Sequence, residues 1–186
     1  MTHFALLTEE TAPDASQPYL QKVTAKNGFL PNLVAVLAHA PTALETYLTV
    51  GEINGRSSLS LIEREVIQIT AASIHGCEFC VAGHTAITSK QTDLPKTVIA
   101  KLQERGHTGD ARIDALVSFV RSVIASRGAV SDGELADFIN AGFEQAQALE
   151  VVLGVSLATL CNFTNNLAKN DINPQLQAFR PGVFQS

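Results

Sequence analysis

Apolar residues recur along the chain at the three- and four-residue spacing of amphipathic helices, and almost no segment alternates as a strand does. Capping boxes that begin at Ser60 and Ser131 mark two helix starts, and glycine or proline marks most helix ends. The predicted helices cover residues 18–26, 31–40, 42–53, 60–75, 77–89, 96–105, 110–127, 131–141 and 145–169. The tail after Pro174 is predicted to be extended.

These helices indicate a single folding unit. No linker rich in Gly, Pro or Ser divides them, and 186 residues are enough to bury a substantial core. We therefore predict an all-α, single-domain helical bundle over residues 1–186. The longest apolar tract, Val151 to Cys161, is too short to span a bilayer, and the N-terminus lacks the basic start of a signal peptide. The sequence thus predicts a cytoplasmic protein without a membrane partner.

The chain has few charged residues, too few to cover its surface. Charged residues make up 17%, against about 25% in an ordinary soluble domain. Because exposed apolar patches usually mark interfaces, we expect a homo-oligomer. The formal net charge is −5 and no basic run interleaved with aromatic residues occurs, which argues against a nucleic-acid partner.

One segment carries the candidate chemistry. Cys77, Cys80 and His84 follow helical spacing, so the two sulfurs and the imidazole lie on one face of the predicted helix. Unpaired backbone N–H groups and the macrodipole at a helix start stabilise a thiolate, the reactive form of cysteine. In the preceding helix, Glu65 is the single charged member of an apolar stripe and needs a partner. If Gly76 turns the two helices back on each other, Glu65 could approach His84 or the cysteines.

The residues alone leave several alternatives open. The helix N-terminus favours acidification of Cys77, whereas the one-turn relation to His84 favours Cys80. Zinc binding by Cys77, Cys80, His84 and Glu65 is possible by ligand type, although three ligands from one helix would be unusual. The cysteine pair could also serve as a redox sensor or a dithiol-disulfide exchanger. A thioredoxin fold is not favoured, because it needs βαβ elements around the pair.

The segment resembles the alkylhydroperoxidase D-like (AhpD-like) group of the carboxymuconolactone decarboxylase superfamily. The resemblance rests on Glu65, the Cys77-Glu-Phe-Cys80 motif and His84, and similar helical order extends over most of the chain. It implies an all-helical oligomer whose cysteine pair reduces organic hydroperoxides, with no metal or other cofactor. An external dithiol reductant, either a thioredoxin-like or a lipoyl-bearing protein, would restore the thiols.

The resemblance also implies a role for each residue. Cys80 would be the peroxidatic thiol, Cys77 its resolving partner and His84 the base, while Glu65 would hold or supply the proton. The characterised peroxidase type is similar to Cys-x-His-Cys, whereas this chain has Phe79 before the second cysteine, so the relay has one titratable member fewer.

The remaining candidates receive structural interpretations. Cys161 is predicted to be a core residue. The histidines at helix ends and in loops, and the asparagines near the C-terminal end of the last helix, are assigned no catalytic role: His39, His75, His107, Asn162, Asn165 and Asn166. Three phenylalanines, Phe29, Phe79 and Phe163, suggest an apolar pocket that favours organic hydroperoxides.

Overall fold

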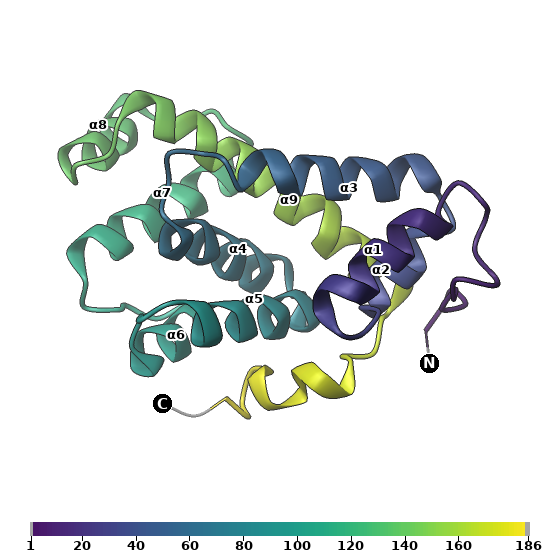
Figure 1. Ribbon diagram of the computed structural model, residues 1–186. Helices are drawn as coiled ribbons and strands as arrows, with labels where there is room; N and C mark the ends of the chain where they lie inside the picture. Colours follow the sequence, from purple (N-terminus) through teal and green to yellow (C-terminus); the bar gives the residue numbers. More distant parts are fainter. Residues whose placement is uncertain (1, 185–186) are drawn as a thin grey trace.

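The computed structural model describes residues 2–184, and these residues form helices without any strand (Figure 1). The predicted all-α class is confirmed. The α-helices are α1 (Gln17–Asn27), α2 (Asn32–Leu37), α3 (Pro41–Asn54), α4 (Leu61–His75), α5 (Glu78–Gln91), α6 (Lys96–Gln103), α7 (Ala111–Ser126), α8 (Asp132–Asn140) and α9 (Gln145–Ala168). Most predicted ends lie within two residues of these bounds. The tail prediction was wrong, because residues 174–179 form a 3₁₀ helix, η1 (Pro174–Phe179), whose Leu176 is buried.

Helix α4 lies in the middle of the molecule and contacts α5, α6, α7 and α9. Its start is fixed by the predicted capping box, in which the Ser60 hydroxyl accepts the Glu63 N–H at 3.2 Å. The Glu63 carboxylate in turn accepts the Ser60 N–H at 2.8 Å, so two otherwise unpaired backbone donors are satisfied. Most of the helix beyond its first turn is buried, because apolar residues cover more than one of its faces.

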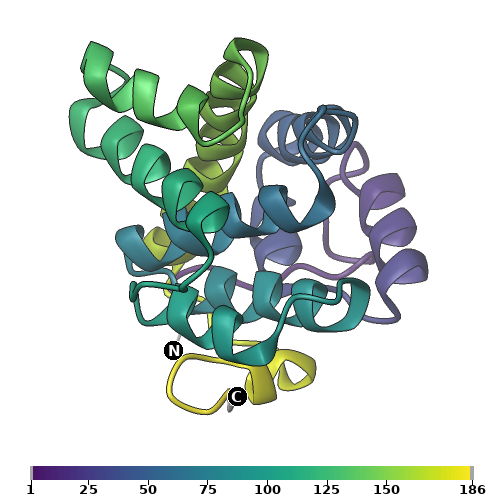
Figure 2. The same cartoon turned by 90° about the vertical axis from the view of Figure 1, so that its left-hand side faces the viewer.

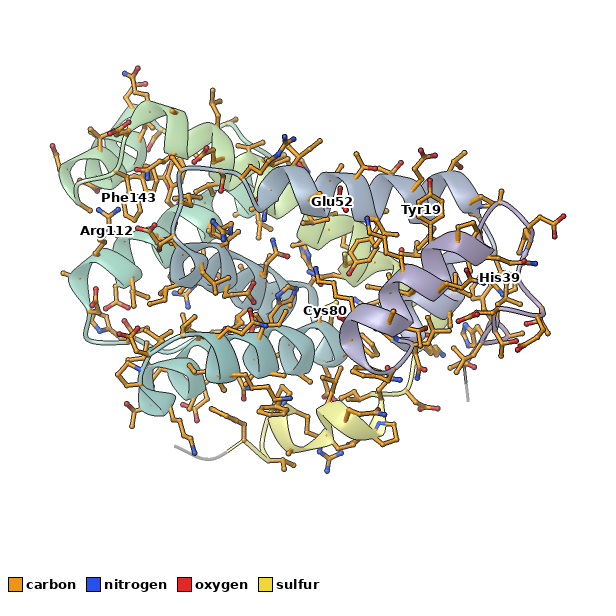
Figure 3. All side chains as sticks on the ribbon, in the orientation of Figure 1. Tyr19, His39, Glu52, Cys80, Arg112 and Phe143 are labelled. Carbon is orange, nitrogen blue, oxygen red and sulfur yellow. The ribbon has the colours of Figure 1, made fainter. Side chains whose placement is uncertain are left out.

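The buried side chains form two hydrophobic clusters. The first joins α1, α2, α3 and α5 with the C-terminal half of α9, and all three cysteines belong to it. The second joins α4, α6, α7 and α8 with the start of α9, and its Phe119, Phe138 and Phe143 rings are stacked. Figure 3 shows Arg112 beside Phe143 at that end, far from Cys80. Figure 2 shows α7 and α8 at the side opposite α1. The chemistry therefore lies in the first cluster.

Two glycines allow the helix arrangement around the cysteines. Gly76 ends α4 in the left-handed conformation at φ +69°, and the Cys77 N–H returns to the Ala72 carbonyl at 2.9 Å. This paired turn at a helix end reverses the chain into α5. Gly154 lets α9 approach α4 closely, because a Cβ atom there would lie 3.0 Å from Ile67 Cγ2. The α4–α5 hairpin and the C-terminal half of α9 are thereby brought together.

Helix α9 has a large apolar surface. By length and composition it is able to cross a membrane, with 24 residues and a mean hydropathy of 1.5 over its most apolar window. It nevertheless packs against α2, α3, α4, α5, α7 and α8, as the core helix of a bundle does. Four of its large apolar side chains remain exposed: Leu149, Val152, Phe163 and Leu167. Such a face is compatible with self-association, and the homo-oligomer stays a prediction.

Candidate functional site

The α4–α5 hairpin places a carboxylate against an imidazole. Glu65 Oε2 lies 2.8 Å from His84 Nδ1, and Glu65 is only 7% exposed. His84 is thus the polar partner that we predicted for Glu65, the one charged residue on the apolar stripe of α4. With Nδ1 held by the carboxylate, neutral His84 has the lone pair on Nε2, which is the arrangement of a general base.

The two thiols of the motif are buried at the start of α5. Cys77 is the N-cap of this helix rather than its first residue, and its Sγ accepts the Cys80 N–H at 3.3 Å. Both cysteines are free thiols, 1% and 5% exposed, and their sulfurs are hydrogen-bonded to each other. The pair is thus close, reduced and shielded from bulk water.

Hydrogen bonding within the pair separates the two acidities. The bond from the Cys80 thiol lowers the pKa of Cys77, and the Cys80 backbone N–H lowers it further. The same bond to Cys77, together with burial, raises the pKa of Cys80. The resting pair therefore keeps one proton on Cys80 and stabilises negative charge on Cys77. This agrees with the acidification of Cys77 that the helix N-terminus favours.

An asparagine of α9 completes the environment of the sulfurs. Asn165 Nδ2 donates to Cys80 Sγ at 3.2 Å and to the Cys161 carbonyl at 3.1 Å, while its Oδ1 accepts from Asn170 at 2.8 Å. This amide lowers the pKa of both thiols. The sequence analysis gave Asn165 no catalytic role, and the structure shows it forming a hydrogen bond between α9 and the Cys80 sulfur of α5. The available signal was a polar residue one turn after Cys161 in an apolar helix, because buried amides need partners.

Two pockets open on the pair from different sides. The Cys80 pocket has a volume of about 370 Å³, and Cys80 and His84 both line it. The Cys77 pocket, about 670 Å³, is lined by Cys77, Asn165 and residues that follow α9. Phe79 lines both pockets. Cys77 and Cys80 therefore border different pockets.

The walls of the Cys80 pocket include apolar side chains, and two of the three phenylalanines predicted for such a pocket are among them. Phe29 and Phe79 line it, but Phe163 does not: it is exposed and packs against His75 at a centroid distance of 5.1 Å. The sequence interpretation missed Tyr47, whose position thirty residues before the motif gave no local signal. Burial raises the pKa of Tyr47, so its hydroxyl stays protonated and can donate a hydrogen bond in the pocket.

The other singled-out residues lie around the site rather than in it. Cys161 is buried as predicted and lines the Cys80 pocket, and burial raises its pKa to about 12, which keeps it an inert thiol. His75 contacts Asn162 at 3.1 Å instead of a sulfur. The zinc alternative lacks a geometric basis within residues 2–184, where no group of three or more His, Cys, Asp or Glu side chains is arranged to hold a metal ion.

Comparison with known proteins finds one family match and several similar folds. Residues 37–105, which include Glu65, both cysteines of the motif and His84, match the model of the carboxymuconolactone decarboxylase family. An AhpD-core, peroxidase-related protein from Ralstonia eutropha superposes with a TM-score of 0.85 at 20% identity, over 96% of this chain and 95% of that one. The segment that holds the site thus matches the carboxymuconolactone decarboxylase family, and the fold of the chain is AhpD-like. No curated protein matches it by sequence.

Two further solved structures with a similar fold are described as different kinds of protein. A peroxidase-related protein from Silicibacter superposes with a TM-score of 0.81 at 21% identity, over 99% of this chain and 96% of that one. A cysteine-to-alanine variant of the debrominase Bmp8, in complex with 2,3,4-tribromopyrrole, superposes with a TM-score of 0.75 at 14% identity, over 96% of this chain and 97% of that one. At these identities the superpositions establish the AhpD-like fold, and activity has to be argued from the site.

Proposed function

We propose that the protein is a thiol-dependent peroxidase that reduces organic hydroperoxides. The observation that carries the proposal is that Cys80 and His84 line one apolar pocket while Glu65 holds the imidazole from behind. A hydroperoxide in this pocket would meet a sulfur, a base oriented by a carboxylate, and the Tyr47 hydroxyl. Apolar walls favour an organic substrate over hydrogen peroxide.

The first half of the cycle oxidises Cys80. His84 Nε2 takes the Cys80 proton, and the thiolate attacks the terminal oxygen of the hydroperoxide. The O–O bond breaks, and the alkoxide leaves as an alcohol after it takes the proton back from His84. The sulfur gains the oxygen and becomes a sulfenic acid, so two electrons have passed from sulfur to the peroxide.

In the second half of the cycle the disulfide forms and is then reduced. The Cys77 thiolate attacks the sulfenic sulfur of Cys80, and hydroxide departs as water with one proton from solvent. An external dithiol then attacks the disulfide, becomes oxidised itself and returns both thiols. Cys77 lines the larger of the two pockets, so a thioredoxin-like or lipoyl-bearing reductant could reach it without entering the Cys80 pocket.

Peroxide turnover by the reduced protein tests the proposal. With cumene hydroperoxide and dihydrolipoamide, we expect many equivalents of peroxide to be consumed per protein, with the Cys77–Cys80 disulfide as the accumulating oxidised form. The loss of hydroperoxide measures turnover, and mass spectrometry of the thiols measures the disulfide. Consumption that stops at one equivalent would indicate a redox sensor instead. Thiols that stay free after excess hydroperoxide would overturn any redox role.

Reductive debromination is a second candidate, favoured by the likeness to Bmp8 over nearly the whole chain. Aromatic side chains of Phe29, Tyr47 and Phe79 line the Cys80 pocket, so a flat halogenated ring has suitable walls. The same dithiol could supply two electrons: carbon loses bromine and gains hydrogen, bromide leaves, and the disulfide forms. Bromide release from polybrominated pyrroles would favour this activity, and no release from any of them beside peroxide turnover would exclude it.

Substitution of Asn165 by alanine is expected to make the dithiol less acidic. The amide stabilises negative charge on the sulfurs, so its removal raises their pKa and leaves less thiolate at pH 7. Hydrogen bonds to charged groups contribute roughly 1.5–3 kcal/mol, so we expect at least a roughly tenfold slower reaction with iodoacetamide. Asn166→Ala is the matched control, because Asn166 donates to the His75 carbonyl and not to a sulfur. Equal alkylation rates in the two variants would contradict the role.

A further inference from the structure

The Cys80 pocket has two lysines among its lining residues and no acid, and we infer that it binds substrates that carry a carboxylate. The inference rests on the proposed peroxidase function and extends it, since it names amphipathic hydroperoxy acids, such as fatty-acid hydroperoxides, as the substrate class. Lys26 and Lys90 are the charged groups concerned, and His84 is the other titratable side chain besides the thiols and Tyr47.

Polarity within the pocket changes from the sulfur outward. The residues at its inner end are apolar or carry the reacting groups, and Leu33, Phe79 and Cys80 among them are buried. The residues at its outer end are polar and exposed: Lys26, Asn27, Lys90 and Gln91. An apolar body with a polar end would match this gradient, with the hydroperoxide group inside and the polar end outside.

Charge decides what that polar end should be. The chain has a net charge of −5, yet the lining of this pocket contains two lysines without any Asp or Glu. Lys22 and Lys101 form ion pairs with carboxylates, whereas Lys26 and Lys90 form none within 4 Å among residues 2–184. An anion at the pocket mouth would therefore meet two lysines that have no carboxylate partner within the described residues, of which Lys90 lies over the Phe179 ring.

The two lysines lie at the ends of helices that line the pocket. Each lies in the last turn of its helix, α1 or α5, where a cation compensates the helix dipole. The C-terminal ends of α1 and α5 meet at this pocket, so both lysines line it. Lys90 follows Cys80 by ten residues on α5, which corresponds to about 15 Å along the helix, and its ammonium lies 5.2 Å from the centre of the Phe179 ring. The pocket is thus elongated along α5, as a chain-like substrate requires.

Binding of two matched ligands tests the inference without any turnover. The probes are 10-hydroxydecanoate, which has the alcohol that peroxide reduction leaves and a carboxylate, and 1,10-decanediol, which has the same length and no charge. By calorimetry on the reduced protein we expect the acid to bind about threefold to tenfold more tightly, as two exposed ion pairs allow. Added salt should remove most of this preference. Equal affinities for acid and diol would overturn the inference.

Lysine variants locate the effect. Lys26→Gln and Lys90→Gln should each weaken binding of the acid but not of the diol, and Lys90→Arg should keep the preference. Lys96→Gln is the control of equal charge change, since Lys96 is exposed on α6 and lines neither pocket. An unchanged preference in the Lys26→Gln, Lys90→Gln double variant would also overturn the inference.

Kinetics separate this inference from the peroxidase proposal. With a fatty-acid hydroperoxide and its methyl ester, we expect the acid to have the lower KM, and the difference to disappear in the double lysine variant. Turnover of all hydroperoxides without a carboxylate preference would refute only the inference. Failure to reduce any hydroperoxide would refute the peroxidase, and the calorimetric preference would then show whether a carboxylate site exists.

Discussion

Cys80→Ser is expected to lower hydroperoxide consumption by at least about 10³-fold, to the level of uncatalysed reaction. A serine hydroxyl is far less acidic and less nucleophilic than a thiol, and the cycle has no other attacking group in the Cys80 pocket. Cys161 lines the same pocket, but burial raises its pKa to about 12, so it offers almost no thiolate as a substitute. Stopped-flow measurement of a single turnover, with excess reduced protein, measures the loss directly.

Cys77→Ser is the matched variant, and it should fail at a later step. Without the resolving thiol, Cys80 should react once with hydroperoxide and then remain as a sulfenic acid, which a dimedone label detects by mass spectrometry. The acidic member of the resting pair is nevertheless Cys77, because the Cys80 thiol donates its hydrogen bond to it. If Cys77→Ser loses the first turnover while Cys80→Ser keeps it, the order of the two cysteines is reversed.

The two sulfurs thus differ in two properties, acidity and access to the base, and each property suits one step of the cycle. Acidity favours Cys77, which sits at the N-cap and receives the hydrogen bonds. Access favours Cys80, which shares a pocket with His84. In the proposed cycle both are used: the base supplies the missing thiolate at the accessible sulfur, and the stabilised thiolate waits to resolve the product. Because Phe79 lines both pockets, it would separate the substrate from the reductant in this cycle.

Local signals predicted most of the fold and part of the site. Capping residues and periodicity located α4 and α5, and the left-handed Gly76 turned them into the hairpin that brings Glu65 to His84. The pairing was foreseeable because a lone carboxylate on a buried stripe needs a partner within a reachable neighbour helix.

The contributions from distant segments were not foreseeable in the same way. Tyr47 lines the Cys80 pocket and Asn165 contacts its sulfur only because α9 packs against both α3 and α5, and periodicity does not specify which helices become neighbours. The 3₁₀ helix after Pro174 was missed for a similar reason. Its Leu176 is buried against the first cluster, so tertiary contact rather than local propensity stabilises it.

Glu65→Gln is expected to slow oxidation of the dithiol by about 10²-fold or more, the usual contribution of a well-oriented base. Glutamine keeps the shape of Glu65, but it cannot stabilise the imidazolium that forms when His84 takes the Cys80 proton. Reduction of the preformed disulfide by dithiothreitol should change much less, since the incoming thiol supplies its own nucleophile. Glu45→Gln, on the exposed side of α3, removes the same charge away from the site and should leave both rates unchanged.

A double variant distinguishes a relay from two independent effects. If Glu65 acts only through His84, Glu65→Gln combined with His84→Ala should be no slower than His84→Ala alone, because the carboxylate has no imidazole left to orient. Added imidazole should partly restore the rate of His84→Ala but not change that of Cys80→Ser. Additive losses in the double variant, with unchanged thermal unfolding, would mean that Glu65 contacts the reaction by another route and that the proposed relay is wrong.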